Sequence, residues 1–344
     1  MSGQVTATAL GDWPGTDPLE AAKAIRGELG TPHLPVLAEL PQRGVGSDAI
    51  GRTALLLADL HADVQPHGWR IVPRPGRDAQ RAESALSTDL NVLADVAGSE
   101  ERSAEQLQVR ILGPLSLMAG LYLGSGERVL ADHGARRDIA QSLAAGVVPF
   151  LERVSRAVPG TRLTVQLDEP DAARVLGGLL PTASGYRTLR SVPSEEARAA
   201  WATVSEALHG AGAEAVVVNL PAWEAPIGRV LAAGADGVSL PLADLTVPQW
   251  EELASAVRRA RMARRAPARR RSARPHGGAR RAHCAAVAPA RPSLLRARRR
   301  SAGSRREPRH THARRGDRPA RAHGHARGRR EPDRAGLSVP PGRT

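Results

Sequence analysis

Short apolar runs alternate with longer segments of helical periodicity along the first three quarters of the chain. The apolar runs predict strands at residues 5–10, 34–40, 106–112, 163–167, 215–219 and 237–240. The periodic segments predict helices from residue 17 onward, over 47–60, 136–158, 197–208 and 227–233, and after residue 246. Strands that alternate with helices are typical of βαβ units and a parallel sheet.

Two of these helices have recognisable first turns. Asp17 is placed to cap a helix in which Pro18 takes the first position and Glu20 the third. Thr246 and Gln249 have the spacing of a capping box. Both signals predict that a helix begins at these residues.

The number of strands indicates an incomplete barrel. About six strand–helix units precede residue 257, and a closed (β/α)8 barrel of the TIM type needs eight. We therefore expect an α/β, TIM-barrel-like domain of about six strands over residues 1–257. A disordered, arginine-rich tail is expected over residues 258–344.

Charge divides the chain at the same place. Residues 1–256 carry 21 basic and 31 acidic side chains, whereas residues 257–344 carry 28 arginines and four acidic residues. The second part contains no Phe, Trp, Tyr, Ile, Asn, Gln or Lys. Such a composition cannot bury enough apolar surface to offset the conformational entropy of the chain.

Two interpretations of the arginine-rich tail remain open. It is either a basic arm that binds nucleic acid non-specifically, or the product of out-of-frame translation. Basic arms normally mix lysine with arginine, and this segment has no lysine. Its dominant residues, Arg, Ala, Pro and Gly, all have GC-rich codons, so we favour a frameshift near residue 257.

The sequence has the features of a cytoplasmic protein. It has no signal-peptide pattern at its beginning and no apolar run near the ~20 residues that would cross a bilayer. Cys284 is the single cysteine, which excludes an internal disulfide framework. We expect a cytoplasmic location and no membrane association.

The candidate chemistry lies where predicted strands end. Residues 165–170 read Val-Gln-Leu-Asp-Glu-Pro, an extended run that ends in the adjacent carboxylates Asp168 and Glu169. Barrel enzymes carry their active sites at the carboxyl ends of strands. The alternative is a solvated turn between a strand and a helix.

Three such strand ends together resemble a known family. Residues 11–16 (Gly-Asp-Trp-Pro-Gly-Thr), 113–117 (Gly-Pro-Leu-Ser-Leu) and 166–170 (Gln-Leu-Asp-Glu-Pro) are similar, in order and spacing, to motifs of cobalamin-independent methionine synthase. The likeness is greatest to the catalytic barrel of that family and to its short actinobacterial single-barrel relatives. It covers roughly residues 5–257, and residues 232–240 also resemble a strand of the family.

The resemblance implies a barrel that transfers a methyl group from methyltetrahydrofolate to homocysteine, with zinc binding the homocysteine sulfur. By position it makes Asp168 the catalytic residue. The residues that it places at the substrate are Asp12, Trp13, Glu39, Asp48, Ser116 and Glu169. We expect Asp12, Ser116 and Asp168 to gather at one end of the sheet.

The zinc ligands of the family have no counterparts here. The family has His-x-Cys after the strand at residues 215–218, where this chain has Asn219, Leu220 and Pro221. The glutamate ligand falls near Pro241, and Cys284 has no matching context. We therefore expect no bound zinc and impaired methyl transfer. The alternatives are a zinc-free barrel that binds a small molecule and a nucleic-acid-associated protein that uses the basic tail.

Overall fold

The computed structural model describes residues 6–9, 12–101, 104–221, 227–241, 245–251 and 253–255. The predicted disorder of residues 258–344, and Cys284, lie outside these residues. The helices are α1 Pro18–Glu28, α2 Ala49–Ala54, α3 Arg77–Gly98, α4 Pro114–Gly120, α5 His133–Ala157, α6 Ala172–Leu176, α7 Ser194–Gly210 and α8 Ile227–Ala232, with short 3-10 helices at Pro41–Arg43 and Val129–Ala131. No helix in the described part of the chain is long and apolar enough to cross a membrane.

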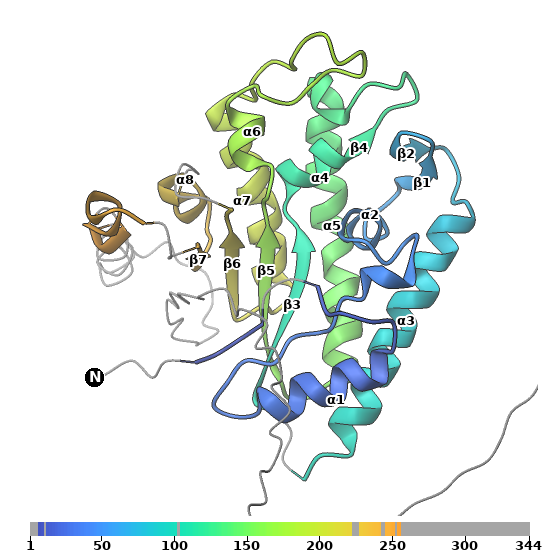
Figure 1. Cartoon of the computed structure of the whole chain (residues 1–344), viewed down its shortest axis with the longest axis vertical. Helices are drawn as coiled ribbons and strands as arrows, with labels where there is room; N and C mark the ends of the chain where they lie inside the picture. Colours follow the sequence, from blue (N-terminus) through green and yellow to red (C-terminus); the bar gives the residue numbers. More distant parts are fainter. Residues whose placement is uncertain are drawn as a thin grey trace, which may run out of the picture. The chain divides into compact units, whose positions relative to one another are not determined.

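A parallel sheet forms the centre of the fold (Figure 1). Its strands are β3 Gln106–Leu112, β5 Arg162–Asp168, β6 Ala215–Asn219 and β7 Gly237–Ser239, which lie side by side in chain order. Two earlier segments extend the sheet in the same order through single parallel bridges, Val36 to Gln108 and Thr8 to Leu34. The predicted parallel α/β fold is confirmed, whereas the described residues do not form a complete barrel.

The two faces of the sheet differ in polarity because successive side chains point in opposite directions. On β3, Leu107, Val109 and Ile111 belong to the main hydrophobic core, together with buried residues of α5 and α7. Burying each such side chain contributes roughly 1.5–3 kcal/mol. The other face carries Gln108 and Arg110, and it continues on β5 and β6 with polar residues. That polar face supplies the site described below.

The segment between residues 61 and 105 holds elements that sequence analysis does not predict. An antiparallel hairpin, β1 His61–Gln65 and β2 Gly68–Val72, pairs through β2 with the short parallel strand β4 Leu121–Tyr122. The long helix α3 follows, and its buried residues Leu86, Leu90 and Leu93 lie on one face. This helix matters for the site, because it carries Asp89.

The predicted helix starts are confirmed at two places. The Asp17 carboxylate accepts hydrogen bonds from the backbone N–H groups of Leu19 and Glu20, at 2.8 and 3.3 Å. The Gln249 side chain accepts from the backbone and hydroxyl of Thr246, at 2.8 and 3.0 Å. The helix predicted over residues 47–60 is shorter than expected and is limited to α2.

Candidate functional site

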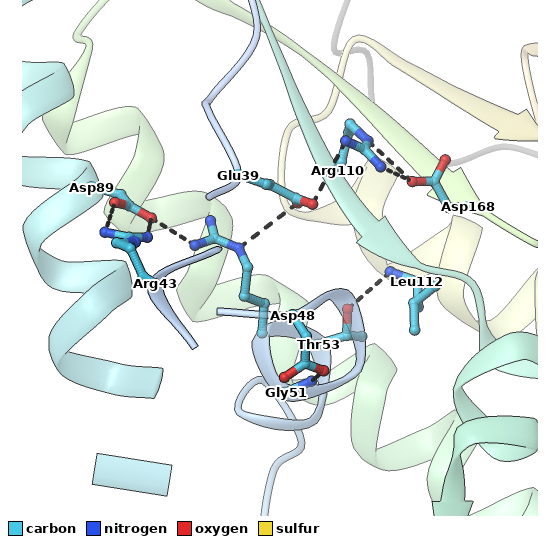
Figure 2. A network of polar contacts seen from close by, with 10 residues as sticks. Glu39, Arg43, Asp48, Gly51, Thr53, Asp89, Arg110, Leu112 and Asp168 are labelled. Atoms are coloured by element: carbon cyan, nitrogen blue, oxygen red, sulfur yellow. Dashed lines mark hydrogen bonds and ion pairs between the residues drawn. The ribbon is translucent and has the colours of Figure 1, made fainter. Parts of the chain in front are cut away.

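Three arginines and three acidic residues, all buried or partly buried, alternate in a chain of ion pairs beside the polar face of the sheet (Figure 2). At one end, Asp89 of α3 accepts two hydrogen bonds from Arg43, at 2.7 and 2.8 Å, and one from Arg52 of α2, at 2.6 Å. Arg52 Nε lies 3.8 Å from Glu39 Oε1. The chain of charges therefore runs from α3 through α2 to Glu39, near the end of the segment over residues 34–40.

At the other end, Asp168 is fully hydrogen-bonded. Its Oδ2 accepts from Arg110 Nε at 3.0 Å and Nη2 at 2.7 Å. Its Oδ1 accepts from the side-chain amides of Gln166 at 2.7 Å and Asn219 at 2.9 Å. A carboxylate has about four acceptor positions, and all four are occupied. Asp168 therefore holds the Arg110 guanidinium in place from the end of β5.

Glu39 and Arg110 form a buried pair with unused hydrogen-bonding capacity. The Glu39 carboxylate is 3.6 Å from Arg110 Nη1, and it accepts no hydrogen bond from any described residue. Arg110 Nη1 is buried and has no hydrogen-bond partner among those residues. Because hydrogen bonds rarely exceed 3.2 Å, this separation leaves both groups available to a third polar group. We call it the Arg110–Glu39 pair.

The electrostatics of the pair follow from its burial. Burial raises the pKa of Glu39. The positive charges of Arg110 and Arg52 oppose this rise, and the negative charges of Asp168 and Asp12 add to it. For Arg110, burial lowers the pKa, but Glu39 and Asp168 outweigh it and the net shift is upward. Arg110 therefore remains a cation, and Glu39 holds a proton more tightly than an ordinary glutamate does.

A second buried carboxylate, Glu169, has a different environment. It accepts hydrogen bonds from the N–H groups of Leu115 at 3.1 Å and Ser116 at 2.8 Å, from the Ser116 hydroxyl at 2.7 Å and from the Trp201 indole at 2.7 Å. Burial raises the pKa of Glu169 to about 7, and the hydrogen bonds from Ser116 and Trp201 pull it down. These contacts join the end of β5 to the first turn of α4 and to α7.

The close approach of Glu169 also explains why residue 113 is a glycine. A Cβ at Gly113 would lie 2.3 Å from Glu169 Oε1. Gly113 is the N-cap of α4, and Leu115 and Ser116 supply two of the free N–H groups that begin every helix. The Gly-Pro turn that ends β3 is thereby shaped to accept the carboxylate.

The structure brings some of the predicted site residues together and gives others internal partners. Glu39 and Asp168 belong to one network, and Asp12 acts electrostatically on both Glu39 and Arg110. The Trp13 N–H donates to the Glu39 carbonyl at 2.9 Å, which places the predicted Asp-Trp turn next to the pair.

The polar atoms of Asp48, Ser116 and Glu169 bind the protein itself. Asp48 caps α2 through the Gly51 N–H at 2.9 Å and accepts from the Trp69 indole at 3.1 Å. The Ser116 hydroxyl donates to Glu169 and accepts from the Asp171 N–H at 3.1 Å. In this arrangement the three residues hold neighbouring elements of the fold together.

Sequence analysis does not single out Arg110, Arg52 or Asp89. A signal for Arg110 exists in the strand Gln-Leu-Gln-Val-Arg-Ile-Leu, where polar residues recur at every second position. Polar residues at that period predict a polar sheet face. No comparable signal identifies Asp89, because its partners, Arg43 and Arg52, come from distant segments.

The residues at the expected zinc position do not fit a metal. Asn219 stands where the family resemblance places a ligand, and its amide N–H points to Asp168. Asp168 is itself occupied by four donors, and Pro241 offers no side-chain ligand. Among the described residues, no three His, Cys, Asp or Glu side chains gather as a metal site requires.

Comparisons with known proteins leave the family open. No protein-family model matches the sequence, and no curated protein matches it. Among solved structures, the chain is similar to a methyltransferase from Methanosarcina mazei, with a TM-score of 0.43 and 9% sequence identity over 70% of this chain and 68% of that chain. A likeness of this degree identifies neither a family nor an activity.

Proposed function

We propose that this chain binds the head group of an α-amino acid at the Arg110–Glu39 pair. The observation that carries the proposal is the buried Arg110 Nη1, which has no acceptor among the described residues and lies 3.6 Å from the Glu39 carboxylate, which has no donor among them. An α-amino acid offers the matching groups on one carbon atom. Its carboxylate accepts from Arg110, and its ammonium donates to Glu39.

The energetics of the pair support this assignment. Buried polar groups without hydrogen bonds each cost about 1–3 kcal/mol, which a ligand that supplies the missing bonds recovers. The arginines on either side keep their positions, because Asp168 holds Arg110 and Asp89 holds Arg52. The motif resemblance places Asp12 and Trp13 beside the same ligand.

Homocysteine is an α-amino acid, so the substrate implied by the motif resemblance has the required head group. Methyl transfer from methyltetrahydrofolate would also need a thiolate. The side chains of Asn219 and Pro241 do not supply zinc ligands to form one. We therefore propose amino-acid binding without zinc as the function of the chain, with methyl transfer impaired.

Calorimetric titration of the purified chain tests the head-group assignment. L-alanine is expected to bind more tightly than N-acetyl-L-alanine, which lacks the ammonium, and more tightly than L-alanine amide, which lacks the carboxylate. Glu39→Gln should weaken L-alanine binding by about 10- to 100-fold, since a hydrogen bond to a charged group contributes about 1.5–3 kcal/mol. Arg110→Lys should do the same, because it loses the forked geometry.

The exposed Glu28 provides a matched control. Glu28→Gln removes the same charge from the end of α1 and should leave L-alanine binding unchanged. If wild-type protein bound the two blocked analogues as well as L-alanine, the head-group assignment would be wrong.

The 28 arginines of residues 257–344 support a second candidate function, which is binding to nucleic acid through phosphate contacts. This activity would be independent of the Arg110–Glu39 pair. Salt-dependent binding of the whole chain to duplex DNA tests it.

A further inference from the structure

Three polar residues form a row across neighbouring strands, one level above Arg110. Asp168 on β5 is the register partner of Asn219 on β6, and Asn219 is the partner of Ser239 on β7. Register partners in a parallel sheet point to the same face. The Asn219 amide reaches the Asp168 carboxylate, so the Ser239 side chain lies on this same polar face.

Ser239 has unused hydrogen-bonding capacity. Its side chain is among the buried polar groups, with 2% of the residue exposed, and its hydroxyl has no partner among the described residues. An unpaired buried hydroxyl is unfavourable and uncommon in folded proteins. Such a group is expected where a ligand completes the hydrogen bonds.

Asn219 presents an acceptor beside it. Its Nδ2 donates to Asp168 Oδ1, which assigns the amide orientation and leaves Oδ1 on the opposite side. No described residue donates to that oxygen, and Asn219 is only partly buried. Asn219 and Ser239 therefore offer one acceptor and one hydroxyl without partners among the described residues, and with no net charge. Asn219 is one of the positions where the motif resemblance expects a zinc ligand.

We infer that Asn219 and Ser239 bind the side chain of the amino-acid ligand, and that this side chain ends in a neutral group that both donates and accepts, a carboxamide or a hydroxyl. The inference rests on the proposed function, because the head group is held at the Arg110–Glu39 pair. Charged side chains are disfavoured, since neither Asn219 nor Ser239 carries a compensating charge. A thiol is a weak donor and acceptor, so it gains little here.

The sheet spacing favours a long side chain. Adjacent strands lie about 4.8 Å apart, so roughly 10 Å separates the backbones at Asp168 and Ser239. A ligand held beside Asp168 must extend over several bonds to reach Ser239. L-glutamine fits this distance better than L-serine, and L-homoserine is intermediate.

Calorimetric titration with four amino acids tests the inference. L-glutamine and L-methionine are similar in length and differ in polarity, L-homoserine carries a hydroxyl, and L-alanine reports the head group alone. We expect L-glutamine to bind about tenfold more tightly than L-methionine, with L-homoserine between them. Ser239→Ala should reduce L-glutamine binding by about tenfold, the effect of one or two hydrogen bonds, and leave L-alanine and L-methionine binding unchanged.

The outcomes separate this inference from the proposed function. If L-alanine binds but wild-type protein does not prefer L-glutamine or L-homoserine over L-methionine, the side-chain assignment is wrong and the head-group assignment survives. If Ser239→Ala weakens all four ligands equally, its effect is on folding and the assignment is also overturned. If no amino acid binds, both proposals fail. Ser205→Ala removes from α7 another buried hydroxyl that has no hydrogen-bond partner in the described part of the chain, and it controls for general loosening of the core.

Discussion

At the residue scale, two carboxylates in one network have opposite chemical properties. Asp168 accepts four hydrogen bonds and has no acceptor capacity left. Among the described residues, the ion-pair partners of the Glu39 carboxylate are two arginines, at 3.6 and 3.8 Å, and burial raises its pKa. Carboxylates whose environments differ in this way commonly have separate roles in one site. Here Asp168 positions Arg110, and Glu39 is the group that remains available to a ligand.

The Glu169 contacts predict a loss of stability in Glu169→Gln. A glutamine amide has one acceptor oxygen and one NH2 group in place of the two carboxylate oxygens. The NH2 group would therefore face two donors, which are either the N–H and hydroxyl of Ser116 or the N–H groups of Leu115 and Trp201. We expect the free energy of unfolding to fall by about 1–3 kcal/mol near pH 8, measured by urea denaturation. Glu206→Gln, on the exposed side of α7, is the control and should have little effect. Equal stability of the two variants would contradict the assigned hydrogen bonds.

The raised pKa of His209 predicts how the stability of the fold depends on pH. Its hydrogen bond to Asp236 raises its pKa above the ordinary value of 6.5, burial lowers it, and the carbonyls of Gly234 and Ala213 add to the rise. The folded protein therefore binds this proton more tightly than the unfolded chain does. The resulting stabilisation is present below about pH 6.5 and is lost as the pH rises through the raised pKa.

The measurement is urea denaturation at a series of pH values between about 6 and 9. We expect the difference in unfolding free energy between wild type and His209→Gln to be largest at the acidic end and to shrink as the pH rises. A difference that grew with pH would show that the folded protein favours neutral His209.

At the scale of elements, the packing of α5 depends on Gly146. A Cβ at this position would lie 1.4 Å from the Leu56 carbonyl oxygen, which is backbone and cannot rotate away. Gly146→Ala should therefore destabilise the fold by about 1–3 kcal/mol, although alanine favours a helix.

Gly27 in α1 is the matched control, because a Cβ there meets nothing within 4 Å. Gly27→Ala should stabilise the protein by about 0.5–1 kcal/mol. Thermal unfolding of the two variants under the same conditions compares them. A stable Gly146→Ala variant would contradict the close approach of α5 to the chain after α2.

Also at the scale of elements, the sequence of α3 has a clear helical periodicity, although no helix was predicted there. Ala82, Leu86, Leu90 and Leu93 recur at intervals of four, four and three, and all are buried. This periodicity predicts an amphipathic helix. The polar residue Asp89 lies in the same helix and is buried because Arg43 and Arg52 surround it.

At the scale of the whole molecule, the charge asymmetry predicts salt-sensitive binding to DNA. The 28 arginines of residues 257–344 release counterions when they contact phosphates. We expect the chain to bind a random DNA duplex at about 50 mM salt and to lose about 10³- to 10⁵-fold in affinity by about 200 mM. Fluorescence anisotropy across this range measures the loss, and Glu39→Gln should not change it.

DNA binding alone would not establish a biological role, because any polycation behaves in this way. Sequencing the gene across codons 250–265 decides between a basic arm and a frameshift. A single reading frame through this region, confirmed by peptides from residues 258–344 in the native protein, would overturn the frameshift interpretation.

The sequence by itself determined the properties that depend on near neighbours in the chain. Apolar periodicity predicted the parallel α/β arrangement, and the caps at Asp17 and Thr246 were visible because a cap and its helix lie within a few residues. Asp168 was also identified because it follows a predicted strand, and Glu39, near the end of the predicted strand over residues 34–40, was identified through the family resemblance.

Only the tertiary structure decided which of these carboxylates is available. Apart from the neighbouring Gln166, the partners of Asp168 come from β3 and β6, and those of Glu39 come from α2 and β3, at separations along the chain that no local pattern reports. Hydrogen-bond saturation depends on distances of a few tenths of an ångström between such segments. For that physical reason the satisfied Asp168, the open Arg110–Glu39 pair and the Ser239 hydroxyl, which the described residues leave without a partner, emerge only once the chain is folded.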